Sequence, residues 1–593
     1  MSESSMDALK AAACEARIHW LNVTQKYRKD GSALIDHEKF PEITISALTE
    51  TSQAGEEIAV PLQRIYTGTK PVIMASLADA PCTIFGLQGL LQRLNTTLGT
   101  SHTLDTPVLS SLLEDCIAKN YDFGTAYGSL RPTWYTEDWS SVPGKILECE
   151  EKDREMRRRA LYGSEIVEPH VHPRRAWDLY CNRVVPMWTT GEDYPGPHGI
   201  SHAWVDEKEL TEVCTPINGR EWPVPIPKDA NLDLVRIELL NKGLEYVWLD
   251  VLCLRQKGGL REDLRVEEWK LDVPTIGMAY HNCKVHCYLS GLGRPLSVTE
   301  DYFRSDCCWF NRAWTLQEVG HQGYEICGVT PDGPLDAKSD QDGNYGSEVL
   351  TTFHQKRRGL TRLDLQPFNV LAEMRRRVST NPVDKIAGMA MLMWSSTIPA
   401  YYESQSLEDA WTALVNTIIS DTRAHLFFWY PEPGNAGTKW RPSWDQVMTT
   451  PLLRDYTSEV RPVGVERDAK TNTDQCNKTF CVENGFVWGL AEIGAPGTDR
   501  YGELLIEDAC GIQHAFPIIA MHQYPIPEDT YTLIRNEFPH NHNPFREQCV
   551  QWAVGRRMLD DRFEKLSVFK MSTDVAKRML DNLSVEKRVN ILV

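Results

Sequence analysis

The residues of this 593-residue chain best suited to chemistry are two carboxylates and an adjacent serine–histidine pair. Glu318 and Asp250 each follow a run rich in apolar residues, and Ser201 and His202 lie within another. A placed carboxylate can stabilise positive charge that develops during a reaction. Adjacent strand residues point to opposite faces, so Ser201 and His202 are not expected to form a nucleophile–base pair with each other.

Two glycine-containing loops follow predicted strands and carry basic residues. One runs Arg255-Gln-Lys-Gly-Gly-Leu-Arg261, and the other runs Gly291-Leu-Gly-Arg294. Glycines let backbone N–H groups approach an anion, and a neighbouring Arg or Lys can hold phosphate. A plain tight turn needs the same glycines, so that structural explanation stays open beside the functional one.

Other candidates have ordinary structural explanations. Asp250 at a strand end most often caps a turn or fixes an arginine such as Arg255 or Arg312, and we favour this over direct catalysis. A glutamate one turn beyond a buried tryptophan, as Glu318 would be, is usually a surface residue or an ion-pair partner. Cys253 is expected to be inert packing. Three tryptophans are expected in the core: Trp248, Trp309 and Trp314.

The sequence argues against three kinds of site: a zinc site, a serine-hydrolase site and a nucleotide-binding loop. His281, Cys283, His286 and Cys287 resemble zinc ligands in number, but a strand through them would point His286 away from the cysteines, so no metal site is predicted. The chain has no Gly-x-Ser-x-Gly elbow, which argues against a serine hydrolase, and no Walker loop, which argues against an appended nucleotide switch.

The elements that must position these residues alternate between strand and helix. Apolar runs at 200–204, 245–254, 284–290 and 325–329 predict strands, and helical periodicity predicts helices at 232–242 and 312–319. Such alternation builds a parallel sheet, and ligands bind at the carboxyl ends of its strands. We therefore predict an α/β, flavodoxin-like domain with its site in the loops after the second and third strands.

The flanking regions differ from this domain. The expected division is a mainly helical N-terminal accessory region (1–165), the parallel-sheet domain (166–330), a helical extension (331–460) and a β-rich, α+β C-terminal module with terminal helices (461–593). Predicted helices include 6–27, 109–119, 148–159, 365–378, 406–420 and a final pair from about 546.

Composition narrows the classes of function. The formal net charge is −19 and the basic clusters are short, so nucleic-acid binding is not expected. No apolar run is long enough to span a bilayer. The polar, acidic start does not resemble a secretory signal, so we expect a cytoplasmic protein with reduced cysteines.

Three spaced motifs resemble the fungal heterokaryon-incompatibility domain, or HET domain. They are Ile200-Ser-His-Ala-Trp204, Tyr246-Val-Trp-Leu-Asp-Val-Leu-Cys-Leu-Arg-Gln256 and Ser305-Asp-Cys-Cys-Trp-Phe-Asn-Arg-Ala-Trp-Thr-Leu-Gln-Glu-Val319. Leu249 and Leu254 are mild departures from the second motif. Segments 377–388 and 441–444 are similar to later markers, so the resemblance covers about 169–444 but neither end.

The HET domain is thought to be a distant relative of the TIR domain, and Trp314-Thr-Leu-Gln-Glu318 resembles the TIR segment Trp-Cys-x-x-Glu, with Thr315 in place of Cys. In enzymatic TIR domains that glutamate is the catalytic residue of NAD cleavage. The resemblance therefore implies a TIR-like sheet, catalysis by Glu318, and NAD as a substrate without a permanently bound cofactor. It also implies non-self recognition, a form of fungal innate immunity in which incompatibility triggers programmed cell death.

The residues expected to contact the substrate lie in and around the three motifs. The 255–261 loop would hold phosphates, and Trp204 or Trp269 would stack on a ring. The full set is Ser201, His202, Trp204, Asp250, Arg255, Gln256, Lys257, Gly258, Gly259, Trp269, Arg312 and Trp314.

Two other functions stay open. One is a non-enzymatic signalling or recruitment module that acts through self-association or an incompatibility partner protein. The other is an enzyme of specialised metabolism on the same scaffold, which a deep apolar pocket would favour.

Overall fold

The computed structural model describes residues 65–191, 196–281, 284–318, 323–329, 334–335, 337–361, 366–450, 463–468, 470–537, 549–583, 585 and 587–593. The predicted helix at 6–27 lies outside these ranges. Within them the chain forms two compact units: unit 1 contains the described residues of 1–364, 377–391 and 397–403, and unit 2 contains those of 365–376, 392–396 and 404–593. The four-part division stays a prediction.

Unit 1 contains a six-stranded mixed sheet with the order β10-β9-β5-β8-β3-β4. Four neighbouring strands are parallel: β5 (His198–His202), β8 (Tyr246–Leu249), β9 (Val285–Tyr288) and β10 (Tyr324–Ile326). In chain order they lie 4-3-1-2 across the sheet. The order reverses beside β5, and such a switch point is where open parallel sheets bind ligands.

The other two strands of this sheet, β3 (Arg175–Asp178) and β4 (Arg183–Pro186), are antiparallel and were not predicted. The combination of helices with a largely parallel sheet confirms the α/β class. All four predicted strands are present; β8, β9 and β10 are shorter than their apolar runs, and β5 begins and ends two residues earlier than its run.

In unit 1 the predicted end of one strand and one predicted helix are wrong. The predicted strand at 245–254 ends at Leu249, and the chain turns at once into the short helix α8 (Asp250–Cys253). The predicted helix at 312–319 is a single 3-10 turn, Trp314–Leu316. Its flanking backbone bonds elsewhere, because Ala313 N donates to Val378 O at 2.9 Å and Val378 N donates to Asn311 O at 2.6 Å.

Helices surround the sheet. From residue 65 to 160 the chain is mainly helical, as predicted, with α2 (Ala75–Ala78), α3 (Cys82–Leu98), α4 (Pro107–Ala118), α5 (Phe123–Leu130) and the long α6 (Val142–Ala160). The remaining helices of unit 1 are α7 (Leu232–Asn241), α9 (Glu262–Asp272), α10 (Glu348–Thr361) and α12 (Asp384–Ala390). Two small sheets are formed by β1 (Leu161–Tyr162), β2 (Glu165–Ile166) and β11 (Ile398–Pro399), and by β6 (Leu210–Val213) and β7 (Val224–Pro227).

Unit 2 begins with the helices α11 (Pro367–Arg375), α13 (Leu407–Thr417), α14 (Ser420–Trp429) and α15 (Trp444–Thr449). Its β-rich part contains β12 (Val465–Asp468), β13 (Thr473–Trp488), β14 (Arg500–Glu507), β15 (Gln513–Ala520), β16 (Asp529–Arg535), β17 (Cys549–Arg557), β18 (Phe563–Ser572), α16 (Thr573–Asn582) and β19 (Lys587–Leu592). The predicted pair of terminal helices is wrong, because among the described residues from 549 onward α16 alone is helical and strands surround it.

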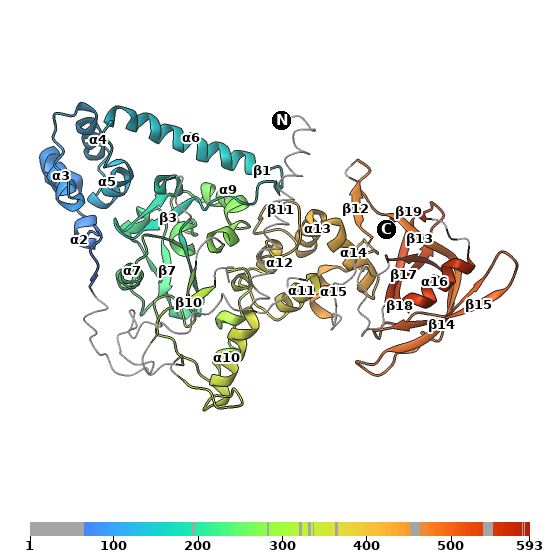
Figure 1. Cartoon of the computed structure of the whole chain (residues 1–593). Coiled ribbons are helices and arrows are strands. Elements are labelled where there is room, and N and C mark those ends of the chain that lie inside the picture. The colour runs from blue at the N-terminus through green and yellow to red at the C-terminus, as the bar shows by residue number, and fades with distance from the viewer. Residues whose placement is uncertain are drawn as a thin grey trace. The chain divides into compact units, whose positions relative to one another are not determined.

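Six of these strands close on themselves. Hydrogen-bonded pairings run β13-β14-β15-β18-β17-β16 and return from β16 to β13 (orange to red in Figure 1). The interior is filled by apolar side chains such as Leu504, Trp552 and Phe569, and α16 adds Val575 and Met579. No helix among the described residues of either unit is long and apolar enough to cross a membrane.

Candidate functional site

The carboxyl ends of β5 and β8 bring three of the predicted residues together. The two strands are parallel neighbours, with Ile200 opposite Leu249. Ser201 and His202 end β5 and Asp250 directly follows β8, so all three lie at the same edge of the sheet. This is the edge at which ligand chemistry was expected.

Glu318 reaches this edge from a segment more than 100 residues away. The Ser201 hydroxyl is hydrogen-bonded to Glu318 Oε2, and Trp309 Nε1 donates to Ser201 Oγ at 2.7 Å. Glu318 is 7% exposed and Ser201 is 1% exposed. The structure therefore joins the first and third sequence motifs through one buried serine.

Burial controls the charge of Glu318. Desolvation raises the pKa of its carboxyl to about 7, and the nearby Asp250 carboxylate adds to the increase. The Ser201 hydrogen bond, His202 and Arg377 act in the opposite direction. A carboxyl with this pKa exists in both protonation states near neutral pH, which suits a group that exchanges protons during a reaction.

His202 and Asp250 form a second pair on the other side of β5. His202 Nε2 lies 2.9 Å from Asp250 Oδ1, Trp204 Nε1 donates to Asp250 Oδ2 at 3.3 Å, and the His202 and Trp204 rings stack at 5.7 Å. Burial alone would lower the pKa of His202, but the Asp250 carboxylate raises it above its usual value. As the alternating side chains of a strand require, Ser201 and His202 do not bond to each other.

Asp250 also caps a turn. Its Oδ1 accepts a hydrogen bond from Val251 N at 2.8 Å, at the start of α8. The expected contact with an arginine is wrong, because the side-chain partners of Asp250 are His202 and Trp204 and not Arg255 or Arg312. The capping half of that expectation is confirmed.

The basic residues of the two glycine loops are engaged in ion pairs. Arg255 lies 2.6 Å from Glu221 and 3.3 Å from Glu268, and Lys257 lies 2.5 Å from Glu403. Likewise Arg261 pairs with Asp263, and Arg294 pairs with Glu209 and Asp229. A phosphate would have to displace these carboxylates, which weakens the predicted role of the 255–261 loop.

The structure of the turn explains why the 255–261 loop has glycines. Gly258 has a φ of 80°, which favours glycine, and a Cβ on Gly259 would lie 2.7 Å from Glu221 O. Gln256 Nε2 donates to Leu254 O at 3.0 Å and to Asp250 O at 3.3 Å. These contacts agree with the plain-turn explanation.

Trp269 also holds this loop. Its indole N–H donates to Arg255 O at 2.9 Å, and the Arg265 guanidinium lies 4.4 Å from its ring centroid. Trp269 is therefore engaged in packing, whereas Trp204 belongs to the His202–Asp250 pair at the sheet edge.

Arg312 is a better candidate for holding an anion. Its guanidinium is half-buried and donates to Thr380 Oγ1 at 3.1 Å, and none of the carboxylates in the described ranges lies within ion-pair distance of it. Burial lowers its pKa, while Glu318 and Asp384 lie within electrostatic reach. Trp314, beside it, is half-buried, unlike Trp248 and Trp309, so the prediction that it lies in the core is wrong.

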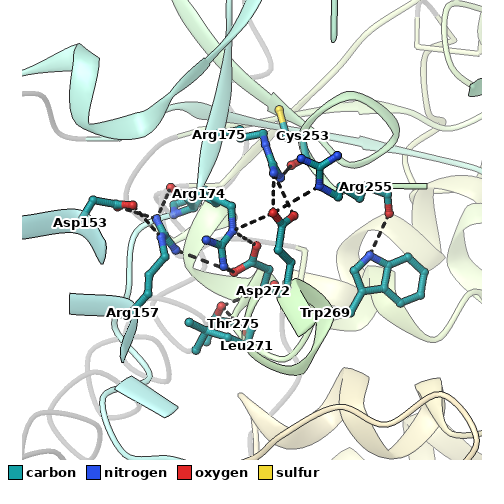
Figure 2. Close-up of polar contacts among 12 residues, drawn as sticks. Asp153, Arg157, Arg174, Arg175, Cys253, Arg255, Trp269, Leu271, Asp272 and Thr275 are labelled. Atoms are coloured by element: carbon teal, nitrogen blue, oxygen red, sulfur yellow. Dashed lines mark hydrogen bonds and ion pairs between the residues drawn. The ribbon is translucent and has the colours of Figure 1, made fainter. Parts of the chain in front are cut away.

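A buried charge network holds α9 against β3 and α6 (Figure 2). Arg174 forms two hydrogen bonds with Asp272, at 2.7 and 3.1 Å, and Arg157 of α6 lies 3.8 Å from the same carboxylate. Arg175 and Arg255 both bond Glu268. This network was not predicted from the sequence.

Sequence reasoning missed two residues beside Glu318. Trp309 was assigned to the core alone, although its N–H bonds Ser201. Arg377 donates to Thr315 Oγ1 at 2.8 Å and to Arg312 O at 2.7 Å, and its charge lowers the pKa of Glu318. Arg377 begins a segment already noted for its resemblance, so that signal could have found it.

Within the described ranges there is no group of three or more His, Cys, Asp or Glu side chains that could hold a metal ion. His286 Nε2 lies 3.3 Å from His198 Nδ1, and burial holds the pKa of His286 well below its usual value. The Cys253 thiol is buried and its pKa is raised to about 12, as expected for an inert packing residue. Cys283 lies outside the described residues.

Comparisons of this chain with protein-family models, with curated proteins and with solved structures found no match.

Proposed function

We propose that this chain is a HET-type effector of fungal non-self recognition that acts in the cytoplasm and cleaves NAD, with Glu318 as the catalytic carboxylate. The observation that carries the proposal is the pairing of Glu318 with Ser201 at the carboxyl edge of the parallel strands. The proposal is supported by the order of these strands, which is the order of a flavodoxin-like sheet, and by the position of the pair at its switch point.

The reaction would break the bond between nicotinamide N1 and ribose C1′. The bonding electrons leave with nicotinamide, which departs neutral, and positive charge develops on the ribose. The Glu318 carboxylate stabilises that charge and accepts a proton from the water that adds to C1′. The products are nicotinamide, ADP-ribose and one proton.

Other residues of the edge would bind the rest of the substrate. Arg312 is the cation expected to face the pyrophosphate, because it has no carboxylate partner among the described residues, unlike the cations of the 255–261 loop. Trp204 is the ring expected to stack on a base. His202 and Asp250 hold Trp204 in place.

The test is nicotinamide release from NAD by the purified full chain, wild type beside Glu318→Gln. Removing a proton-accepting carboxylate should lower turnover by about 100-fold or more. Glu238→Gln is a matched control, because Glu238 is also a buried carboxyl in unit 1 whose pKa is raised to about 7 and which accepts a hydrogen bond from a hydroxyl, that of Tyr288. That variant should keep its turnover.

Thermal melts would show that both variants fold. Equal loss of turnover in the two variants would remove Glu318 from its proposed role. Absence of turnover in the concentrated wild-type protein would contradict the hydrolase and favour a non-enzymatic recruitment module.

A further inference from the structure

The hydrogen bonds around Ser201 have a fixed direction whenever Glu318 is ionised. An indole N–H can only donate, so Ser201 Oγ accepts from Trp309 Nε1 at 2.7 Å. An ionised carboxylate can only accept, so the single hydroxyl proton of Ser201 must point to Glu318 Oε2. Trp309, Ser201 and Glu318 therefore form a chain of bonds that ends on one carboxylate oxygen.

Trp309 is itself rigidly held. It is 0% exposed, its ring stacks on Tyr324 of β10 at 6.3 Å, and Phe310 contacts it edge-on at 5.4 Å. Its carbonyl oxygen accepts a hydrogen bond from the Thr315 hydroxyl at 2.7 Å. The donor that reaches Ser201 thus comes from a fixed part of the core.

Ser201 has one alternative acceptor. Cys287 lies opposite it on β9, and its sulfur is within hydrogen-bonding reach of the Ser201 hydroxyl. Burial raises the pKa of the Cys287 thiol well above its usual value, so Cys287 stays neutral and is the weaker acceptor. The Ser201 hydroxyl therefore donates to Glu318, and not to Cys287, whenever the Glu318 carboxyl is ionised.

The other carboxylate oxygen of Glu318, Oε1, differs from Oε2 in its hydrogen bonds. Glu318 Oε1 accepts no hydrogen bond from the residues that the structure describes, whereas Oε2 is bonded to Ser201. The two oxygens of Glu318 therefore differ in their environment.

We propose that Trp309 is a positioning residue of this site: its indole N–H holds Ser201 Oγ, commits the Ser201 proton to Oε2 and leaves Oε1 to face the ribose. This inference rests on the proposed role of Glu318. It assigns Trp309 no contact with the substrate, and it predicts that the indole N–H acts on the reaction only through the Ser201–Glu318 bond.

A test of this proposal must account for the other charges that face Glu318. Asp250 and His202 come from the edge of β5 and β8, Arg377 and Arg312 from the segments that pair at 312 and 378, and Tyr280 and Cys287 from the 3-10 turn at 276–280 and from β9. None of these groups bonds the Trp309 indole N–H. A Trp309 variant therefore changes one donor and leaves this charged environment in place.

The experiment compares the pH dependence of kcat/KM for NAD in wild type, Trp309→Phe, Ser201→Ala and Ser201→Thr. Loss of the hydroxyl in Ser201→Ala should move the acidic limb of the profile to higher pH by about one unit, because a hydrogen bond to a charged group is lost. Trp309→Phe should move it in the same direction by about half a unit, because donor chains reinforce one another. Ser201→Thr keeps the hydroxyl and should restore the wild-type profile.

Trp248→Phe is the matched control. Trp248 is a buried tryptophan of β8 that contacts Tyr280 edge-on at 5.6 Å but does not bond Ser201. Its substitution removes a comparable volume and should leave the pH profile unchanged. Identical profiles for Trp309→Phe and Trp248→Phe would overturn the proposal.

A second readout does not depend on turnover. The difference in melting temperature between each background and its Glu318→Gln derivative reports the titration of Glu318 in the folded chain. The pH at which this difference develops should rise in Trp309→Phe and not in Trp248→Phe. An unchanged pH in Trp309→Phe would contradict the positioning role even if no NAD turnover were found, which separates this failure from failure of the proposed function.

Discussion

Glu318 stabilises the fold best when it is uncharged. Its folded pKa of about 7 lies above the ordinary value of 4.5 because burial disfavours the ionised form. Between these two pH values the unfolded chain is ionised at this residue while the folded chain stays protonated, so the free energy of unfolding falls as pH rises. A carboxylate placed for catalysis is therefore expected to cost stability.

This predicts that Glu318→Gln stabilises the protein at high pH. Glutamine cannot ionise, so the variant should gain on the order of 3 kcal/mol over wild type at pH 8 and almost nothing at pH 4. Urea denaturation at both pH values, followed by tryptophan fluorescence, measures the difference in the free energy of unfolding. A gain of equal size at the two pH values would show that Glu318 does not titrate with a raised pKa.

At the residue scale, the sequence predicted which residues lie near one another better than which hydrogen bonds they form. As the motifs implied, one edge of the sheet brings together Ser201, Trp204, Asp250 and Glu318. The partner of Ser201 could not be predicted, because 117 residues separate it from Glu318 and only the fold brings them together. Similarly, nothing local indicates that Glu403 pairs with Lys257.

At the scale of the elements, hydrophobic periodicity predicted long helices and buried strands well. The helices α4, α6 and α7 and all four parallel strands follow from it. The predicted helix at 312–319 failed because its backbone groups bond to the segment at 378, which no local pattern reveals. The strand predicted at 245–254 ends early, at Leu249, because a short apolar run fits a strand and a buried helix equally well.

The charge network of Figure 2 leads to a prediction for α9. Asp272 of α9 accepts two hydrogen bonds from Arg174 and lies near Arg157 of α6, so Asp272→Asn leaves both guanidinium groups without this carboxylate. The variant should lose about 2 kcal/mol of unfolding free energy in urea. Glu267→Gln, which removes an exposed ion pair with Lys270 on the same helix, is the control and should leave the urea midpoint unchanged. Equal effects of the two variants would mean that the buried network adds nothing.

At the scale of the whole molecule, the charge of −19 would act on the proposed anionic substrate before any contact is made. NAD carries a net negative charge, so long-range repulsion should slow its approach at low ionic strength. We expect kcat/KM for NAD to rise about twofold between roughly 20 and 200 mM salt, as the screening length shortens. A decrease over this range would show that local cations such as Arg312 outweigh the overall charge.

The ring of strands in unit 2 is closed unevenly. β15 pairs with β14 along its whole length, but it shares only one residue pair with β18, Ile519 with Lys570. Most of the edge of β15 that faces β18 therefore has no strand partner among the described residues, and an edge of this kind is where a second chain can add a strand. In the six-stranded sheet the end strands are shorter, with four residues in β4 and three in β10. If copies of this chain join by strand addition, β15 is the expected place.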